Sequence, residues 1–185
     1  ELSSLSRDDY QSQANKTVSI FARVYLGIFA LAFFSYWAAG MSAFDAVNHA
    51  FSVCATGGFS THNLSVGYFH STLISVLTII FMVLASLHFG LLYIAFVSRS
   101  LRPLNNPVLK FFLFSLAGAS VLAAVSLKLQ GVDATWGEAF LDATFHVASY
   151  TSTSGLAISD NSGWPILPCF LLIIGGLVCG CAGAT

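Results

Sequence analysis

The chain has 185 residues, of which 56% are hydrophobic and only 8% are charged, and its mean hydropathy is +0.80. Soluble domains carry about a quarter charged residues, so this composition excludes an ordinary water-soluble domain and predicts that most of the chain lies in a lipid bilayer. The net charge of −1, without any cluster of Lys and Arg, excludes a nucleic-acid-binding surface.

Two long apolar segments in the first half of the chain are separated by a short helix and a polar loop. Residues 1–16 are polar, and we expect them to form a loop that leads into the first helix. The apolar runs at 18–41 and 73–97 can each span the membrane, since about 20 apolar residues cross the hydrocarbon core. Between them, residues 42–45 (Ser-Ala-Phe-Asp) match a helix N-terminal capping pattern. The helix that this pattern begins, at 43–55, is too short to span.

The second half of the chain repeats this order of elements. A third apolar run lies at 108–127, and a second capping pattern, at 135–138 (Thr-Trp-Gly-Glu), begins a short helix at 136–150. A last apolar run occupies 164–184. We therefore predict an all-α membrane protein built from two units, each containing a span, a pore helix, a loop and a second span. The two units cover residues 1–100 and 101–185.

A shift of ninety-seven positions aligns the two short helices and the loops that follow them. It places residues 44–60 on residues 141–157, and the Asp, Ala, His, Ser, Thr and Gly positions coincide. Each copy ends in Thr-x-Gly and a large apolar residue, a pattern similar to the TVGYG selectivity filter of potassium channels. We call the two segments the first Thr–Gly loop (residues 55–60) and the second Thr–Gly loop (residues 152–157).

A single glycine-bearing segment between helices favours an ordinary turn, whereas the repeat and its place between apolar runs favour an ion filter. Non-helical backbone at membrane depth is tolerated only where protein buries it or where it lines a water-filled cavity. Glycine accepts the torsions that turn carbonyls toward a pore, and the C-terminal end of each short helix favours a cation. The candidate filter residues are Thr56, Gly57, Gly58, Phe59, Thr153, Ser154, Gly155 and Leu156. The candidate K⁺ ligands are the backbone carbonyls of Thr56, Gly57, Thr153 and Ser154.

The distribution of positive charge predicts the orientation of the chain in the membrane. Six of the seven Lys and Arg residues lie in the N-terminal flank and in the connection at 98–110. The loops at 42–70 and 129–163 contain none, so the positive-inside rule places both Thr–Gly loops outside. Lys128, at the outer end of the third span, is the exception.

Three motifs together resemble a known family. They are Ala55-Thr56-Gly57-Gly58-Phe59-Ser60-Thr61-His62-Asn63, Thr153-Ser154-Gly155-Leu156, and Gly180-Cys181-Ala182-Gly183-Ala184-Thr185. This pattern is similar to the potassium-uptake membrane subunits of the TrkH/KtrB/HKT superfamily, and most similar to TrkH. The resemblance implies four consecutive span-pore-span repeats that fold as a pseudo-tetramer around one pore, of which this chain carries the first two. Family members continue beyond the position of Thr185, and their gate residues lie in the later repeats.

The resemblance also implies the partners and the location. It implies a multi-pass protein of the bacterial inner membrane that forms a homodimer, contacts membrane lipid and binds a cytosolic, TrkA-like nucleotide-binding regulatory ring. Potassium is then the transported ion, and no organic cofactor is expected in this chain. We predict an ion-conducting subunit and not an enzyme. A channel of only two repeats that dimerises to complete four filters is the alternative within transport.

Two pairs of polar residues recur at equivalent positions of the short helices. Asp45 and Asp142 each precede a histidine by one turn, His49 and His146. Paired intramembrane histidines also suggest haem ligands of an electron-transfer subunit, but such ligands come from spanning helices that face each other. A histidine paired with its own Asp at i,i+4 is the favoured interpretation, which makes these four residues pore-helix supports. The carboxylates also suggest a proton relay, although their place near the helix start favours capping.

Overall fold

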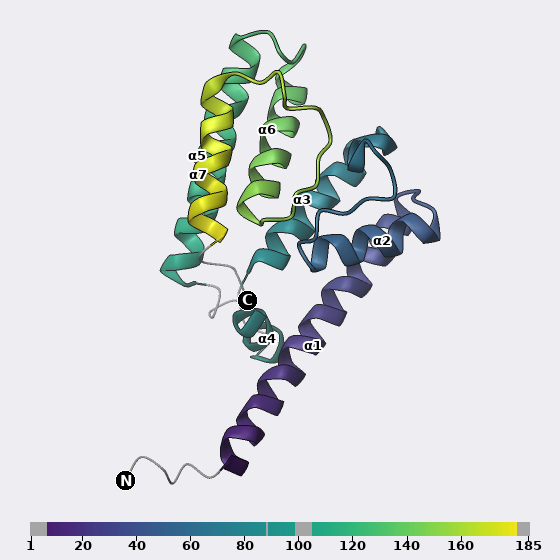
Figure 1. The fold of residues 1–185 in the computed structure, drawn as a ribbon, viewed down its shortest axis with the longest axis vertical. Coiled ribbons are helices and arrows are strands. Elements are labelled where there is room, and N and C mark those ends of the chain that lie inside the picture. Colours follow the sequence, from purple (N-terminus) through teal and green to yellow (C-terminus); the bar gives the residue numbers. More distant parts are fainter. Residues whose placement is uncertain (1–6, 88, 99–104, 181–185) are drawn as a thin grey trace.

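The computed structural model describes residues 7–87, 89–98 and 105–180, and this part of the chain is helical without a strand (Figure 1). The predicted all-α fold is therefore confirmed. The helices, in chain order, are α1 (Arg7–Ala38), α2 (Ala43–Cys54), the 3-10 helix η1 (Ser65–Phe69), α3 (Thr72–Ser86), α4 (Phe89–Ser98), α5 (Pro107–Leu129), α6 (Trp136–Thr151) and α7 (Ile166–Gly180).

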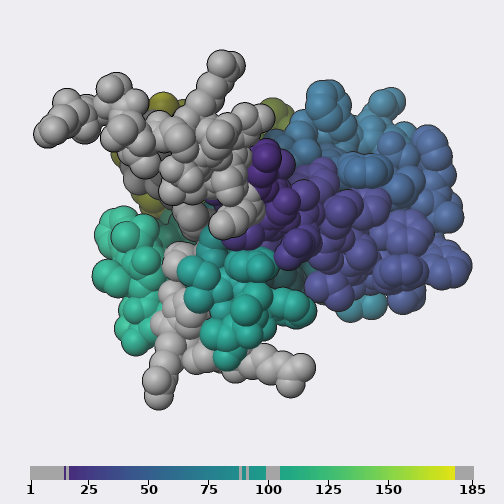
Figure 2. All heavy atoms as spheres, turned by 90° about the horizontal axis from the view of Figure 1, so that it is seen from below, coloured from purple at the N-terminus to yellow at the C-terminus, as the bar shows by residue number. Residues whose placement is uncertain are grey.

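The helices form two groups that meet where α3 packs against α6. Helices α1 to α4 make up the first group, and α5, α6 and α7 lie together in the second (Figure 1). Seen from the end at which α1 begins, the atoms of α1 to α3 and those of the start of α5 occupy opposite sides (Figure 2). Phe145, Ala148 and Leu156 of the second half belong to the same buried cluster as Tyr36 and Met82 of the first half. The two halves therefore share this cluster, and a second cluster, which includes Ala123, Leu127 and Val147, belongs to the second half alone.

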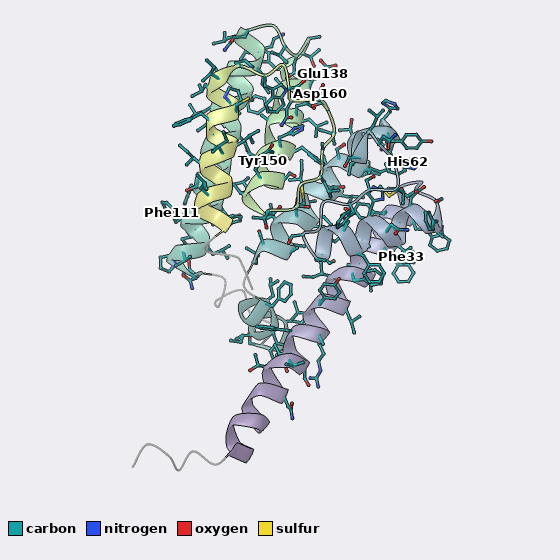
Figure 3. The ribbon with its side chains drawn as sticks, viewed as in Figure 1. Phe33, His62, Phe111, Glu138, Tyr150 and Asp160 are labelled. Atoms are coloured by element: carbon teal, nitrogen blue, oxygen red, sulfur yellow. The ribbon has the colours of Figure 1, made fainter. Side chains whose placement is uncertain are left out.

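Two helical stretches, Thr17–Ala38 and Pro107–Leu129, are long and apolar enough to cross a membrane by length and composition. The apolar helices Thr72–Ser86 and Ile166–Leu177 are shorter. Large apolar side chains point away from the protein along these helices, among them Phe111 of α5 (Figure 3). Exposure of this apolar surface to water would cost free energy, whereas contact with lipid tails would not.

Both predicted helix caps are confirmed. At the start of α2, the backbone N–H of Asp45 donates to Ser42 Oγ over 3.1 Å. At the start of α6, Thr135 and Glu138 form a reciprocal capping box, with N···O distances of 3.2 Å and 2.9 Å. These bonds satisfy N–H groups that the first turn of a helix leaves without a backbone acceptor. The start of each short helix is thus set by local sequence.

Two segments in the first half differ clearly from those predicted. Helix α1 begins at Arg7, so residues 7–16 are helical and not a loop, which agrees with the absence of Gly and Pro from this polar stretch. The run at 73–97, predicted as one span, is divided into α3 and α4. The helix stops at Leu87, whose backbone is extended, and α4 packs against α1, where Phe89 meets Phe21 edge to face.

The last predicted span starts at Ile166, two residues later than expected, and α7 continues to Gly180. Residues 181–185, which contain most of the third family-like motif, lie outside the described residues.

Candidate functional site

The two Thr–Gly loops follow the same backbone path. Thr56 and Thr153 both have positive φ, at 48° and 56°, and the glycines two positions later, Gly58 and Gly155, have φ of 70° and 73°. A positive φ is uncommon for a residue with a side chain, and it is least favourable for a β-branched residue such as Thr. The same unusual torsions at equivalent positions indicate that both loops are held in one specific conformation.

The ends of α2 and α6 are closed by equivalent hydrogen bonds. The N–H of Gly57 donates to the Ser52 carbonyl and that of Ser154 to the Ser149 carbonyl, each over 2.8 Å. The chain therefore leaves both helices by the same turn. Each loop also starts at a helix C-terminus, where the aligned peptide dipoles give a partial negative charge.

The carbonyls of the four predicted ligand residues lack hydrogen-bond donors in the described part of the chain, and Ser154 is 1% exposed. Within residues 7–87, 89–98 and 105–180, no hydrogen bond reaches the backbone oxygens of Thr56, Gly57, Thr153 and Ser154. The Leu156 carbonyl differs, because it accepts a 2.6 Å hydrogen bond from Ser149 Oγ. Unpaired carbonyl oxygens are the ligands by which a filter replaces the hydration shell of a cation.

The two loops lie against each other at their glycines. A Cβ atom added to Gly58 would lie 2.7 Å from the Ser154 carbonyl oxygen and 3.4 Å from Gly155 Cα. A Cβ atom added to Gly155 would lie 3.5 Å from Gly58 Cα. Gly58 therefore has two reasons to lack a side chain, its positive φ and the neighbouring backbone. Glycine at this position allows two loops from opposite halves of the chain to approach closely.

The carboxylates Asp45 and Asp142 each bind the segment that leaves the loop after their own helix. Thr61 Oγ1 donates to Asp45 Oδ1 and Ser159 Oγ donates to Asp142 Oδ2, both over 2.6 Å. Hydrogen bonds from Thr61 and then from Ser42, which donates over 2.7 Å, lower the pKa of Asp45 below its ordinary value. The ionised carboxylate thus joins the start of α2 to the exit of the first Thr–Gly loop.

The histidines make a second connection between each helix and its loop. His49 Nδ1 lies 2.8 Å from the Asp45 carbonyl oxygen and its Nε2 lies 2.9 Å from Ser60 Oγ. His146 Nδ1 lies 2.9 Å from the Asp142 carbonyl oxygen and its Nε2 lies 3.3 Å from the Ser159 carbonyl oxygen. The i,i+4 pairing of each histidine with its Asp therefore goes through the Asp backbone, and the carboxylates bind elsewhere.

The first and second loops differ in how their large apolar residue is covered. Phe59 is 81% exposed, whereas Leu156 is 2% exposed and packs in the core that the two halves share. Ser149 donates to the Leu156 carbonyl, while Ser52, its equivalent, has no partner for its buried hydroxyl within the described residues. The sequence repeat aligns Ser52 with Ser149, but it does not predict that only Ser149 hydrogen-bonds its loop.

Sequence reasoning assigned no role to the polar loop after the first Thr–Gly loop, and several of its residues contact the site. His62 stacks on Tyr68, with ring centroids 3.6 Å apart, and its Nε2 lies 3.3 Å from Asp45 Oδ1 (Figure 3). Ser65 and Gly67 contact the second loop, since the N–H of Ala157 donates to Ser65 Oγ and that of Gly67 donates to the Ala157 carbonyl. Of these residues, His62 lies in the first family-like motif, and Gly67 carried a structural signal because glycine often marks close backbone approach.

Comparison with known proteins identifies the family of the chain. Residues 4–185 match the family model described as "TrkH: Cation transport protein". The Trk system potassium uptake protein TrkH of Halomonas elongata is 38% identical over 152 residues, which is 82% of this chain and 31% of that protein. TrkH of Vibrio parahaemolyticus is 32% identical over 165 residues, 88% of this chain and 34% of that protein.

A solved structure agrees with these sequence matches. The crystal structure of the potassium transporter TrkH from Vibrio parahaemolyticus superimposes with a TM-score of 0.82 at 30% identity, and the match covers 87% of this chain and 35% of that one. The chain therefore spans about a third of the length of the curated relatives that it matches. On the family model, the sequence identities and the shared fold, this chain belongs to the TrkH family of cation transport proteins.

Proposed function

We propose that this chain forms part of the K⁺ pore of a Trk-type uptake system and that its two Thr–Gly loops are filter segments. The observation that carries the proposal is the pair of loops with similar positive φ angles, in contact at Gly58 and Gly155, each with two carbonyls that have no donor in the described residues. Such carbonyls coordinate a dehydrated cation without any chemical step. The protein is then a transport subunit and not an enzyme, and K⁺ is its cargo.

The ligands in this proposal are the carbonyls of Thr56, Gly57, Thr153 and Ser154. Asp45 and Asp142 hold the segments that leave the loops, because they accept hydrogen bonds from Thr61 and Ser159. The C-terminal ends of α2 and α6 add partial negative charge beside the ion. An inside-negative membrane potential supplies about 2.3 kcal/mol per elementary charge per 100 mV, which is sufficient to drive uptake.

We place the protein in the bacterial inner membrane with both Thr–Gly loops facing outward. The excess of Lys and Arg in the N-terminal flank and in the connection at 98–110 supports this orientation. The arrangement of the helices also supports it, because the start of α1, α4 and the start of α5 lie toward one end of the molecule, and the α5–α6 connection lies at the other (Figure 1).

The assembly that we propose follows from the family. The relatives are named as parts of a Trk system. We propose that the complete protein forms a homodimer, that lipid covers the outward-facing apolar side chains, and that a cytosolic nucleotide-binding ring of the TrkA type regulates it. The remaining filter segments would come from the same polypeptide, because the relatives are about three times as long as this chain. A dimer of two-repeat channels is the less favoured arrangement.

The contacts of the histidines argue against the haem-binding alternative. Each ring nitrogen of His49 and His146 already faces a hydrogen-bond partner within 3.3 Å. An axial ligand needs a free ring nitrogen directed at the iron. Neither ring offers one.

The substitution Gly58→Ser in the full-length protein tests the proposed function. We expect that liposomes with the wild-type protein take up K⁺ in preference to Na⁺, and that the variant has a lower K⁺/Na⁺ flux ratio because the new side chain meets the Ser154 carbonyl. The control is Gly163→Ala, since Gly163 has open space around it. An unchanged K⁺/Na⁺ flux ratio in Gly58→Ser would show that Gly58 is not part of the filter.

A further inference from the structure

Both backbone polar groups of Ala157, at the exit of the second Thr–Gly loop, are bound by the first half of the chain. The N–H of Ala157 donates to Ser65 Oγ over 3.2 Å, and its carbonyl accepts from the N–H of Gly67 over 3.3 Å. Ser65 and Gly67 belong to η1, the short helix that follows the first loop. These two bonds connect residues about ninety positions apart, across the boundary between the two halves.

The backbone of η1 also approaches the residue that follows Ala157. A Cβ atom on Gly67 would overlap the Ile158 carbonyl oxygen and lie 2.9 Å from the carbonyl carbon. Gly67 does not have a positive φ, so the close approach is what requires glycine here. Any larger residue must push the second loop and η1 apart.

Helix η1 is itself held firmly in the first half. Val66 is buried in the core cluster that contains Leu156, and Phe69 packs edge to face on His49 with ring centroids 5.4 Å apart. Ser65 has a positive φ of 54°, and its N–H donates to the His62 carbonyl. We call the two hydrogen bonds that join Ser65 and Gly67 to Ala157 the clamp. The clamp therefore comes from packed residues and not from a free surface loop.

The first loop has no equivalent clamp in the described residues. Its corresponding residue, Ser60, is held through its hydroxyl by His49, which belongs to its own helix, and by the N–H of His62. The second loop is held from its own helix by Ser149, which binds the Leu156 carbonyl, and in addition from the first half through η1. Helix η1 thus helps to position Ser154 and Gly155 relative to Gly58, together with the contacts of Ser159 with Asp142 and His146.

We propose that Ser65 and Gly67 are positioning residues for ion selectivity, which fix the second Thr–Gly loop at its distance from the first. The inference rests on the proposed function of the two loops as filter segments. Carbonyl ligands select an ion by their number and spacing. Loss of the clamp at Ala157 changes that spacing without removing any ligand.

The test measures K⁺ and Na⁺ flux in liposomes with full-length protein that carries Gly67→Ala, Ser65→Ala or Ser65→Gly. Loss of one neutral hydrogen bond corresponds to about a fivefold change in an equilibrium, so we expect the K⁺/Na⁺ flux ratio to fall in both Ser65 variants, by at most about that factor. We expect a larger fall in Gly67→Ala. The control is Gly118→Ala on α5, where no atom lies within 4 Å of an added Cβ, and its ratio should equal that of the wild type.

The two Ser65 variants separate the hydrogen bond from backbone strain. Both lose the hydroxyl, but only Ala keeps a side chain at the positive φ. If the K⁺/Na⁺ flux ratio falls equally in Ser65→Ala and Ser65→Gly, the loss of selectivity comes from the missing hydrogen bond to Ala157. If Gly67→Ala does not fold, the Ser65 variants decide the outcome.

Two results would overturn the inference. Equal losses of K⁺ and Na⁺ flux, with an unchanged ratio, would show that Ser65 and Gly67 have only a structural role. Wild-type flux and ratio in all variants would show that neither residue contributes to the site. Both outcomes require a wild-type protein that conducts K⁺ selectively. Absence of K⁺ flux in the wild type would instead contradict the proposed function itself.

Discussion

Gly58 and Ser154 lie so close together that a Cβ atom on Gly58 would stand 2.7 Å from the Ser154 carbonyl oxygen. The relationship is not symmetric, because a Cβ atom on Gly155 would meet only Gly58 Cα, at 3.5 Å, an ordinary van der Waals distance. The two glycines occupy equivalent positions and have nearly equal φ. Their tolerance of a side chain therefore differs because of the space around them and not because of their torsions.

We predict that Gly58→Ala lowers the K⁺/Na⁺ flux ratio more than Gly155→Ala in the full-length protein. Both substitutions place a Cβ atom at positive φ, which costs about 1 kcal/mol, but only the first also displaces a carbonyl that we propose as an ion ligand. Ion flux in liposomes measures the ratio, and thermal unfolding of each purified variant measures the shared strain. Equal ratios in the two variants would show that the close approach to Ser154 has no part in selectivity.

The bond between Thr61 and Asp45 predicts a stability effect. Thr61→Val removes the 2.6 Å hydrogen bond and is expected to destabilise the protein by about 1 kcal/mol, since the acceptor is charged but not deeply buried. The melting temperature of the purified protein measures this effect. Thr72→Val, at an exposed position in the first turn of α3, is the matched control and should have little effect.

The same carboxylate predicts a dependence on pH. Because its pKa is lowered in the folded protein, Asp45 stabilises the fold fully above its ordinary pKa of about 4, and this contribution is lost as the pH falls through the lowered value. The melting temperature should therefore fall as the pH is lowered below about 5, and it should fall less in Asp45→Asn. A decline of the same size in the variant would mean that other carboxyl groups account for the acid sensitivity.

How far the sequence predicts this structure depends on the distance between the interacting residues. The caps of α2 and α6 were predictable because Ser42 with Asp45, and Thr135 with Glu138, lie within one turn of each other. The Thr-x-Gly repeat placed the two loops at equivalent positions, where the structure has equal torsions.

Contacts between distant segments were not predictable in this way. The clamp of Ser65 and Gly67 on Ala157, and the burial of Leu156 but not Phe59, depend on how the two halves pack. The break at Leu87 has no Pro or Gly at that residue to mark it, and it depends on the contact of α4 with α1. Apart from the glycine at position 67, the single sequence contains no signal for these features.

Orientation in the membrane can be tested by labelling single cysteines in a Cys-free full-length protein. Cysteines at Asn63 and Ser162, both exposed in the loops that we propose to face outward, should react with a membrane-impermeant thiol reagent added from outside, and one at Asn105 should not. Asn63 is preferable to Ser65, whose hydroxyl binds the second loop. The opposite pattern, with labelling only at Asn105, would invert the proposed topology.

We propose that further filter segments complete the pore; the number of loops carries this proposal, and the open surface at Phe59 agrees with it. Leu156, at the equivalent position, is 2% exposed because residues of the first half cover it, whereas Phe59 is 81% exposed. A carbonyl ring that replaces the hydration shell of K⁺ needs contributions from about four strands, and this chain supplies two. The unpaired carbonyls would otherwise face lipid, where unsatisfied backbone groups are costly.

We therefore predict that residues 1–185 expressed alone do not support K⁺ uptake, whereas the full-length protein does. The assay is growth of a K⁺-uptake-deficient bacterium on low K⁺, with the amount of each protein in the membrane checked by blot. The isolated piece should also accumulate poorly, because its unpaired loop carbonyls would meet lipid. If the piece reaches a comparable level and restores growth, two repeats suffice, and a dimer of two-repeat channels replaces the four-repeat pore as the functional unit.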